Sequence, residues 1–253
     1  MSSEVVLVER HGPITHLILN RPEVRNALNI TLLTQLIVEL DAVAADPTQR
    51  VVILRGAGPC FCAGLDLKEA ADPAIAHESA TLVGAILAKL VESPAVTIAA
   101  AHKAAIAGGA GLIMACDFVV VDPTFKTGFP EVHRGLVAGL VMTLLRRQVA
   151  ERTARELLIL GETIDAERAL SVGLVNRIAP EGALEETATE LAQKALKGGP
   201  GAIALTKKML NGLWPRPLAE DLQHALDCHM EARSSPEAKE GMAAFREKRE
   251  PNW

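Results

Sequence analysis

Apolar residues in the first part of the chain change from strand spacing to helix spacing and back. The runs Val5–Glu9 and Ile14–Leu19 flank the turn His11-Gly12-Pro13, which predicts a β-hairpin. Five apolar residues then recur at helical spacing and predict a helix that ends before Asp46-Pro47: Leu32, Leu33, Leu36, Leu40 and Val43. The continuous apolar run Val51–Leu54 follows and predicts a buried strand.

The middle of the chain repeats an order of strand, glycine turn and helix. After a first glycine turn, an amphipathic helix is expected over Ser79–Val91, where Ser93-Pro94 stops it. Ala95–Ala101 reads as a buried strand, a second glycine turn and helix start follow, and Phe118–Val121 is a further strand. This order favours repeated ββα units in an α/β fold over a simple alternation of helix and strand.

The last part of the chain is mainly helical. We expect one helical region over Leu144–Leu160 with a single break, a short strand over Val172–Ile178, and a helix over Glu185–Leu196. About three more helices should follow Gly198-Gly199-Pro200, with a break at Trp214-Pro215-Arg216-Pro217. The predicted organisation is therefore a mixed core of residues 1–197 and a helical region of residues 198–253.

Composition and charge exclude several classes of partner. The chain has a net charge of −5, 3% aromatic residues and no Tyr, so neither nucleic acid nor an anionic membrane is an expected partner. The N-terminus lacks a signal-peptide pattern and no apolar run is long enough to cross a bilayer, so we expect a cytoplasmic protein. The four cysteines have the spacing of neither a zinc site nor a disulfide framework, and we expect them reduced and buried, with no metal.

Two glycine turns carry the candidate chemistry. One lies in Phe61-Cys62-Ala63-Gly64-Leu65-Asp66-Leu67 and the other in Ala107-Gly108-Gly109-Ala110-Gly111-Leu112. A strand that turns into a helix leaves backbone N–H groups pointing outward at the positive end of the helix dipole. Two such turns facing each other would offer two donors to one negative oxygen. Each turn alone is also common in α/β proteins, so a purely structural role stays open.

The residues of these two turn segments resemble two signature segments of the enoyl-CoA hydratase/isomerase family, also called the crotonase family. Arg21–Asn29, Phe129–Val132 and Phe245–Arg249 match further family segments in the same order, so the resemblance covers nearly the whole chain. It implies an α/β, crotonase-like spiral of ββα units with a C-terminal helical trimerisation region. A homotrimer or a dimer of trimers is the expected assembly.

The resemblance also implies an acyl-CoA thioester substrate, with coenzyme A as part of that substrate and no further cofactor. The family stabilises an enolate at the thioester oxygen, and the positions of its two N–H donors correspond here to Leu65 and Gly108. The acyl-CoA site would further include Arg25, Ala63, Asp66, Leu67, Lys68 and Gly109. A helix cap at Asp66 and an exposed surface cation at Arg25 are equally open readings.

Glu131 is the candidate acid–base residue, because it occupies one of the two catalytic glutamate positions of the family. It follows Gly128-Phe129-Pro130 in an apolar stretch, and burial of a carboxyl group raises its pKa toward neutrality, which suits proton transfer near pH 7. A solvated loop glutamate is the alternative. The second glutamate position of the family's hydratases falls on Gly111, which has no side chain. His133 and Glu69 are the candidates to take over the role of the missing glutamate.

Because Gly111 replaces the second glutamate of the family's hydratases, three functions stay open. Hydratase is weakly preferred because Pro130–Val137 resembles hydratase members, whereas the missing carboxylate argues for an enoyl-CoA double-bond isomerase. A non-catalytic acyl-CoA-binding protein is the third. A serine hydrolase is disfavoured because no serine is flanked by glycines at both two-residue offsets, and Gly108-Gly109-Ala110-Gly111 lacks the full dinucleotide-binding fingerprint.

Overall fold

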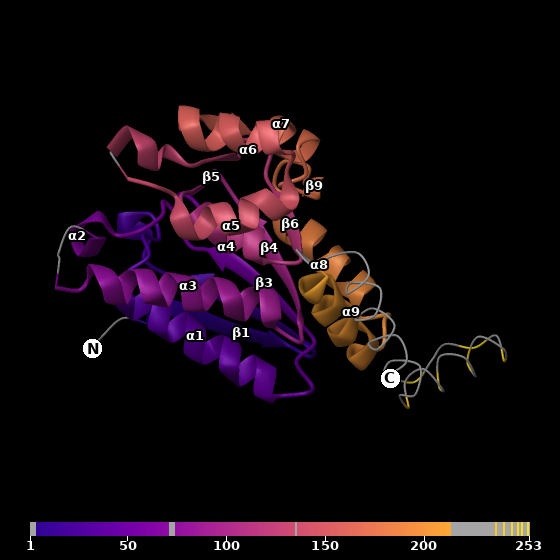
Figure 1. The fold of residues 1–253 in the computed structure, drawn as a ribbon. Helices are drawn as coiled ribbons and strands as arrows, with labels where there is room; N and C mark the ends of the chain where they lie inside the picture. Colours follow the sequence, from indigo (N-terminus) through magenta and orange to yellow (C-terminus); the bar gives the residue numbers. More distant parts are fainter. Residues whose placement is uncertain are drawn as a thin grey trace.

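The structure is a computed structural model that describes residues 4–70, 74–134 and 136–213 and isolated positions between 236 and 252 (Figure 1). The expected helices after residue 213, with the break at Trp214–Pro217 and most of the Phe245–Arg249 segment, lie outside the described residues. The prediction of a helical region over 198–253 can therefore be followed only through its first helix.

One six-stranded sheet forms the centre of the fold, in the order β1-β2-β3-β4-β6-β9. Only β1 and β2 are antiparallel, and they form the expected hairpin. The strands are β1 (Val6–His11), β2 (Ile14–Leu19), β3 (Val51–Gly56), β4 (Val96–Ala101), β6 (Phe118–Val121) and β9 (Arg177–Ile178). The sheet is thus parallel through the strands that lead into the glycine turns.

A second layer of short strands lies where each long strand has ended. It contains β5 (Ala104–Ile106), β7 (Lys126–Gly128) and β8 (Thr163–Asp165), in the order β5-β7-β8. Single bridges extend this layer, from Cys62 to Ala105 and from Leu28 to Leu65. From β4, and again from β6, the chain supplies a long strand, a short strand and a helix, which is the ββα order expected from the sequence.

Helices cover both faces of the central sheet. Alternate residues of β3 divide between two cores: Val52 and Leu54 belong to the larger core, and Val51 and Ile53 to a smaller one that includes Leu191 of α8. In Figure 1, α1 (Ile30–Ala45) and α3 (Ala76–Glu92) lie side by side, and α8 (Leu184–Ala195) lies toward the C-terminal side. The remaining helices are η1 (Pro22–Val24), α2 (Leu67–Ala70), α4 (Gly108–Ala115), η2 (Pro130–Arg134), α5 (Gly139–Gln148), α6 (Glu151–Arg155), η3 (Glu156–Leu160), α7 (Ala166–Ser171) and α9 (Pro200–Gly212).

Two expectations for the last third of the core differ in outcome. The predicted break in the helical region over Leu144–Leu160 is confirmed, because α5 ends at Gln148 and α6 begins at Glu151. The predicted strand over Val172–Ile178 is wrong except at its last two residues. Gly173, at a φ of +89°, ends α7 there, and the N–H of Leu174 donates to the carbonyl oxygen of Ala169.

The helix α9 is attached to the core by a buried lysine. The Lys207 side chain is 8% exposed, and its Nζ donates to the Ala95 carbonyl oxygen at 2.7 Å and to Asp117 Oδ2 at 2.5 Å. The same carboxylate oxygen accepts hydrogen bonds from the Thr97 N–H and hydroxyl. Asp117 therefore joins the end of α4 to the start of β4 and to α9.

Candidate active site

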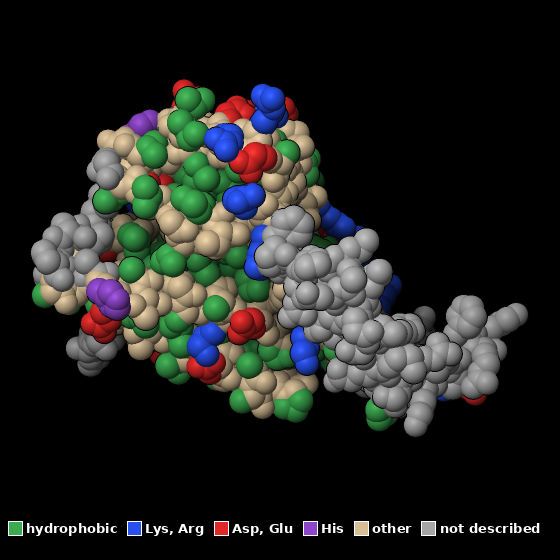
Figure 2. Space-filling view, viewed as in Figure 1, with side chains coloured by type: hydrophobic (Ala, Val, Ile, Leu, Met, Phe, Trp, Pro, Cys, Tyr) green, Lys and Arg blue, Asp and Glu red, His purple; other side chains and the backbone are tan. Residues whose placement is uncertain are grey.

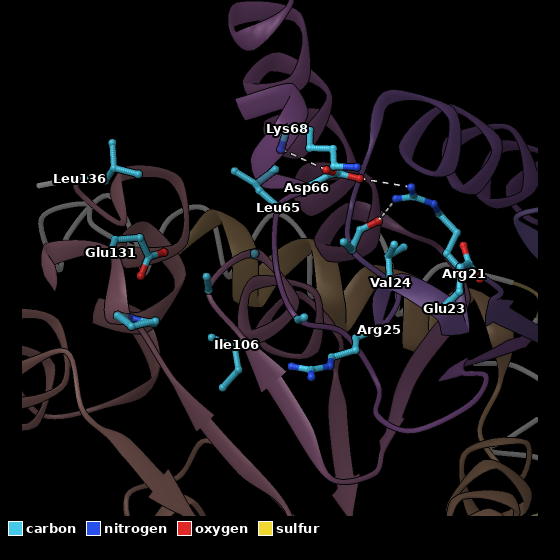
Figure 3. Close-up of a pocket in the computed structure, with 15 residues that line it drawn as sticks. Arg21, Glu23, Val24, Arg25, Leu65, Asp66, Lys68, Ile106, Glu131 and Leu136 are labelled. Carbon is cyan, nitrogen blue, oxygen red and sulfur yellow. Dashed lines mark hydrogen bonds and ion pairs between the residues drawn. The ribbon is translucent and has the colours of Figure 1, made fainter. Parts of the chain in front are cut away.

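A cavity of about 570 Å³ lies between the two glycine turns, η1 and η2 (Figure 3). Of the residues expected from the sequence, Arg25, Ala63, Leu65, Asp66, Lys68, Gly108 and Glu131 line it. They come from four segments that are far apart in the sequence. The fold brings these segments together because the second layer of strands sets the turns beside one another.

The two glycine turns are in direct contact. Gly64 has a φ of +98°, and a Cβ atom there would lie 2.9 Å from the Ile106 carbonyl oxygen and 3.6 Å from the Gly108 nitrogen. A Cβ atom at Gly108 would lie 3.7 Å from the Leu65 nitrogen. A Cβ atom at Gly64 would be too close to the Ile106 carbonyl oxygen, and the φ there is positive, so glycine at this position permits the close approach of the two turns. The distance at Gly108 is that of ordinary van der Waals contact.

Leu65 and Gly108 present their N–H groups at this contact. The neighbouring N–H of Asp66 donates to the Leu28 carbonyl oxygen at 2.9 Å, and that of Gly111 donates to the Ala107 carbonyl oxygen at 3.0 Å. Within the described residues, neither the Leu65 N–H nor the Gly108 N–H donates to a protein acceptor. Gly108 also begins α4, where the helix dipole favours negative charge. The arrangement suits a single anionic oxygen.

Glu131 faces the cavity from the opposite wall. It is the second residue of η2, it is half-buried, and its Oε2 atom is shielded from solvent. Figure 3 shows its carboxylate turned toward the cavity, across from Arg21, Glu23 and Arg25. A carboxylate in this position can exchange a proton with a molecule whose oxygen is held by the two N–H groups.

Basic side chains lie at the other end of the cavity. Arg25 and Lys68 are exposed, and Arg21 is held in place because its Nη2 contacts Asp66 Oδ2 at 3.1 Å. Asp66 Oδ1 also accepts a hydrogen bond from the Lys68 N–H at 3.1 Å, so the carboxylate both caps α2 and anchors an arginine. Glu23 and Asp66 line the cavity as well, and Arg21 is paired with Asp66, so the exposed Arg25 and Lys68 are the cations best placed for an anionic ligand.

Two glycines considered from the sequence, Gly109 and Gly111, do not line the cavity. Gly109 is buried, and a Cβ atom there would lie 2.6 Å from the Cys62 carbonyl oxygen, so it serves the contact of α4 with the first turn. Leu67 is the first residue of α2. A Cβ atom at Gly111 would lie 2.6 Å from Val141 Cγ1 and 3.3 Å from Leu87 Cδ2. Apolar side chains therefore pack directly on Gly111.

Neither candidate substitute for a carboxylate at Gly111 reaches it. His133 is exposed, and its Nε2 lies 2.7 Å from the Leu160 carbonyl oxygen. Glu69 accepts a hydrogen bond from the Ile30 N–H at 2.8 Å, at the start of α1. Both side chains are held by other elements.

Asn26 and Arg21 are the residues that sequence reasoning did not single out. Asn26 is fully buried at a φ of +55°, and its Nδ2 lies within 3.0 Å of the carbonyl oxygens of Ala57, Cys60 and Phe61. Its Oδ1 accepts a hydrogen bond from the Arg21 N–H at 2.8 Å. Asn26 thus ties η1 to the loop before the first glycine turn. Both residues lie in the Arg21–Asn29 segment, whose resemblance to a family segment was the one feature of the sequence that could have pointed to them.

The three described cysteines are buried thiols that do not line the cavity. Cys60, Cys62 and Cys116 are free and buried, and burial raises the pKa of Cys62 and of Cys116 to about 12. Cys228 lies outside the described residues. Among the residues that the structure describes, no three His, Cys, Asp or Glu side chains form a group that could hold a metal ion. That no metal and no nicotinamide cofactor is needed stays a prediction.

None of the helices in the described part of the chain is both long and apolar enough to span a bilayer.

Comparisons with known proteins agree on one family. The sequence model of the enoyl-CoA hydratase/isomerase family matches residues 9–253. A Thermus thermophilus protein described as a candidate enoyl-CoA hydratase is 38% identical, over 98% of this chain and 100% of its own. An enoyl-CoA isomerase/hydratase of Mycosarcoma maydis is 33% identical, over 94% and 91%. The crystal structure of a Mycobacterium smegmatis enoyl-CoA hydratase has a TM-score of 0.94 at 29% identity and covers 99% of both chains.

Proposed function

This chain belongs to the enoyl-CoA hydratase/isomerase family and is an enzyme that acts on acyl-CoA, and we propose that it does so with a two-donor oxyanion hole and one glutamate. The observation that carries the proposal is the contact of the two glycine turns, with the Leu65 and Gly108 N–H groups at one wall and Glu131 at the other. Donors aimed at a developing oxyanion are typically worth roughly 3–4 kcal/mol of barrier each.

The roles of the residues follow from the charge that the reaction develops. Removing a proton from C2 of a 3-enoyl thioester, or adding a nucleophile at C3 of a 2-enoyl thioester, places negative charge on the thioester oxygen. The N–H groups of Leu65 and Gly108 stabilise that charge, and the Glu131 carboxylate carries the proton. Arg21, Arg25 and Lys68 bind the phosphates of coenzyme A at the basic end of the cavity.

One glutamate can serve two reactions on this substrate. Hydration, our first proposal, adds the hydroxyl of water at C3 and a proton at C2, and it agrees with the names of the Thermus thermophilus and Mycobacterium smegmatis proteins. The second candidate is a double-bond shift, in which Glu131 takes a proton from C2 of a 3-enoyl-CoA and returns it at C4. The packing of Val141 and Leu87 on Gly111 favours this candidate, because no second carboxylate can bind water there without rearrangement.

Absorbance at the enoyl-thioester band distinguishes the candidates. Hydration of crotonyl-CoA removes the band, whereas isomerisation of a 3-enoyl-CoA generates it. A panel of both substrate types, varied in acyl length, should show turnover of at least one. Binding of coenzyme A esters with turnover of none would contradict the proposal and support an acyl-CoA-binding protein.

We further propose that the protein assembles as a homotrimer or a dimer of trimers. Hydrophobic side chains gather around α5 on the face in Figure 2. Val137 precedes α5 and lines one hollow together with Ile159, and these two residues are 77% and 64% exposed. Apolar side chains exposed to this extent next to one another are typical of an interface. Light scattering at micromolar concentration tests this, and a monomer would contradict it.

A further inference from the structure

Ala107 carries a side chain at a backbone conformation that normally belongs to glycine. Its φ of 53° and ψ of −117° are those of the first central position of a type II′ turn. A methyl group is strained at such a position, and strained residues persist where the surrounding structure holds them, often at functional sites. The question is therefore what the methyl group of Ala107 contributes.

The backbone of Ala107 is held on both sides. Its N–H donates to the Gly128 carbonyl oxygen at 2.9 Å, and its carbonyl oxygen accepts from the Gly111 N–H at 3.0 Å. The first bond joins it to the end of β7, three residues before Glu131, and the second joins it to the first turn of α4. The peptide that carries the Gly108 N–H is thus fixed relative to both elements.

The methyl group of Ala107 lies at the contact between the two donor turns. A Cβ atom at Gly64 would lie 3.1 Å from the Ala107 Cβ, so the methyl group packs against the Gly64 backbone. Ala107 also lines the cavity and is only half-buried. Leu65 follows Gly64, and Gly108 follows Ala107, so this methyl group lies beside the peptides that carry the donors.

We propose that the methyl group of Ala107 is a spacer that sets the distance between the Leu65 and Gly108 N–H groups, which makes Ala107 a positioning residue for the oxyanion hole. The inference rests on the proposed function, because it assumes that these N–H groups bind the thioester oxygen. Without the methyl group, two glycine-like backbones face each other and the peptide before Gly108 gains rotational freedom. The donors then lose their preorganisation, although each N–H is still present.

The test compares Ala107→Gly with Lys103→Gly. Lys103 is a matched control because it also has a positive φ, of 57°, and it is exposed at the other end of β5, away from the cavity. The probe is butyryl-CoA labelled with ¹³C at the thioester carbonyl, a saturated ester with no double bond to hydrate or shift. The infrared stretching frequency of that carbonyl falls as the hydrogen bonds to its oxygen become stronger.

We expect wild type and Lys103→Gly to lower the carbonyl frequency equally, and Ala107→Gly to lose at least half of that shift. We also expect kcat of Ala107→Gly to fall about 10-fold, which is less than the roughly 10²–10³-fold that follows loss of a whole donor. KM should change less than about threefold, because the charged contacts at the basic end of the cavity are unchanged.

Each other outcome has a separate meaning. No shift in wild type would contradict the oxyanion hole itself, and with it the proposed function. A wild-type shift that Ala107→Gly retains in full would overturn the spacer alone. A melting temperature of Ala107→Gly below that of Lys103→Gly would also overturn it, because the methyl group would then serve packing of the fold.

Discussion

Replacing Asn26 with alanine should loosen the first glycine turn and destabilise the whole fold. The side chain is fully buried, and its two Nδ2 hydrogens are shared among the carbonyl oxygens of Ala57, Cys60 and Phe61. Its Oδ1 accepts from the Arg21 N–H. Alanine makes none of these bonds and leaves the backbone groups buried without a partner.

The magnitude follows from the lost bonding of two Nδ2 hydrogens and one Oδ1 atom, which together make four hydrogen bonds, and from one strained backbone. Each bond contributes about 1 kcal/mol net, and a left-handed conformation costs alanine about 1 kcal/mol more than asparagine. We therefore expect Asn26→Ala to lower the free energy of unfolding by about 3–5 kcal/mol, a large part of the stability of an ordinary domain.

Urea denaturation at one fixed protein concentration measures this, because assembly makes apparent stability depend on concentration. Asn20→Ala is the matched control: its Nδ2 donates to the Glu4 carbonyl oxygen at 2.8 Å in an exposed position, so about 1 kcal/mol or less should be lost. If Asn26→Ala and Asn20→Ala lost the same stability, the assignment of Asn26 as the link between η1 and the turn would be refuted.

Three further changes test other parts of the structure. Lys207→Ala should lower the free energy of unfolding by about 1–3 kcal/mol, because the buried Ala95 carbonyl oxygen and the partly exposed Asp117 carboxylate lose their charged donor. The exposed Lys208→Ala should change it little, as measured in urea. Burial, followed by the Arg55 cation, lowers the pKa of His16 below its usual 6.5. The unfolded chain therefore binds the proton at a higher pH than the folded chain does, and the free energy of unfolding should fall as the pH drops through 6.5. His16→Gln should flatten that part of the profile in urea titrations at several pH values. Gly111→Glu should raise the hydration rate of crotonyl-CoA only when Val141→Ala is added, because Val141 occupies the space of the new Cβ; a rise in the single variant would show that the packing yields.

Long elements could be predicted from the sequence because their apolar residues alone specify them. The β1–β2 hairpin and the helix α1 have enough residues to show a pattern, and β3, β4 and β6 are continuous apolar runs. The short strands β5, β7 and β8 could not be predicted, because three residues carry no period and their pairing depends on contacts far along the chain.

The candidate site divides in the same way. The glycine turns and Glu131 could be selected because backbone donors and a carboxylate in an apolar stretch are local signals. The link made by Asn26 spans more than 30 residues, and its partners are carbonyl oxygens, which leave no mark in a sequence. The packing of Val141 on Gly111 is likewise a contact between two helices, and only the structure reveals it.

The role of Glu131 is tested most directly by Glu131→Gln, which keeps the shape of the side chain and removes its titratable proton. Turnover of the best substrate in the enoyl-CoA panel should fall about 10²–10⁴-fold, while the dissociation constant for butyryl-CoA should stay within about threefold, because the Leu65 and Gly108 N–H groups and the basic end of the cavity are unchanged. Turnover of Glu131→Gln within a factor of about two of wild type, well below that range, would show that another group carries the proton and would contradict the account.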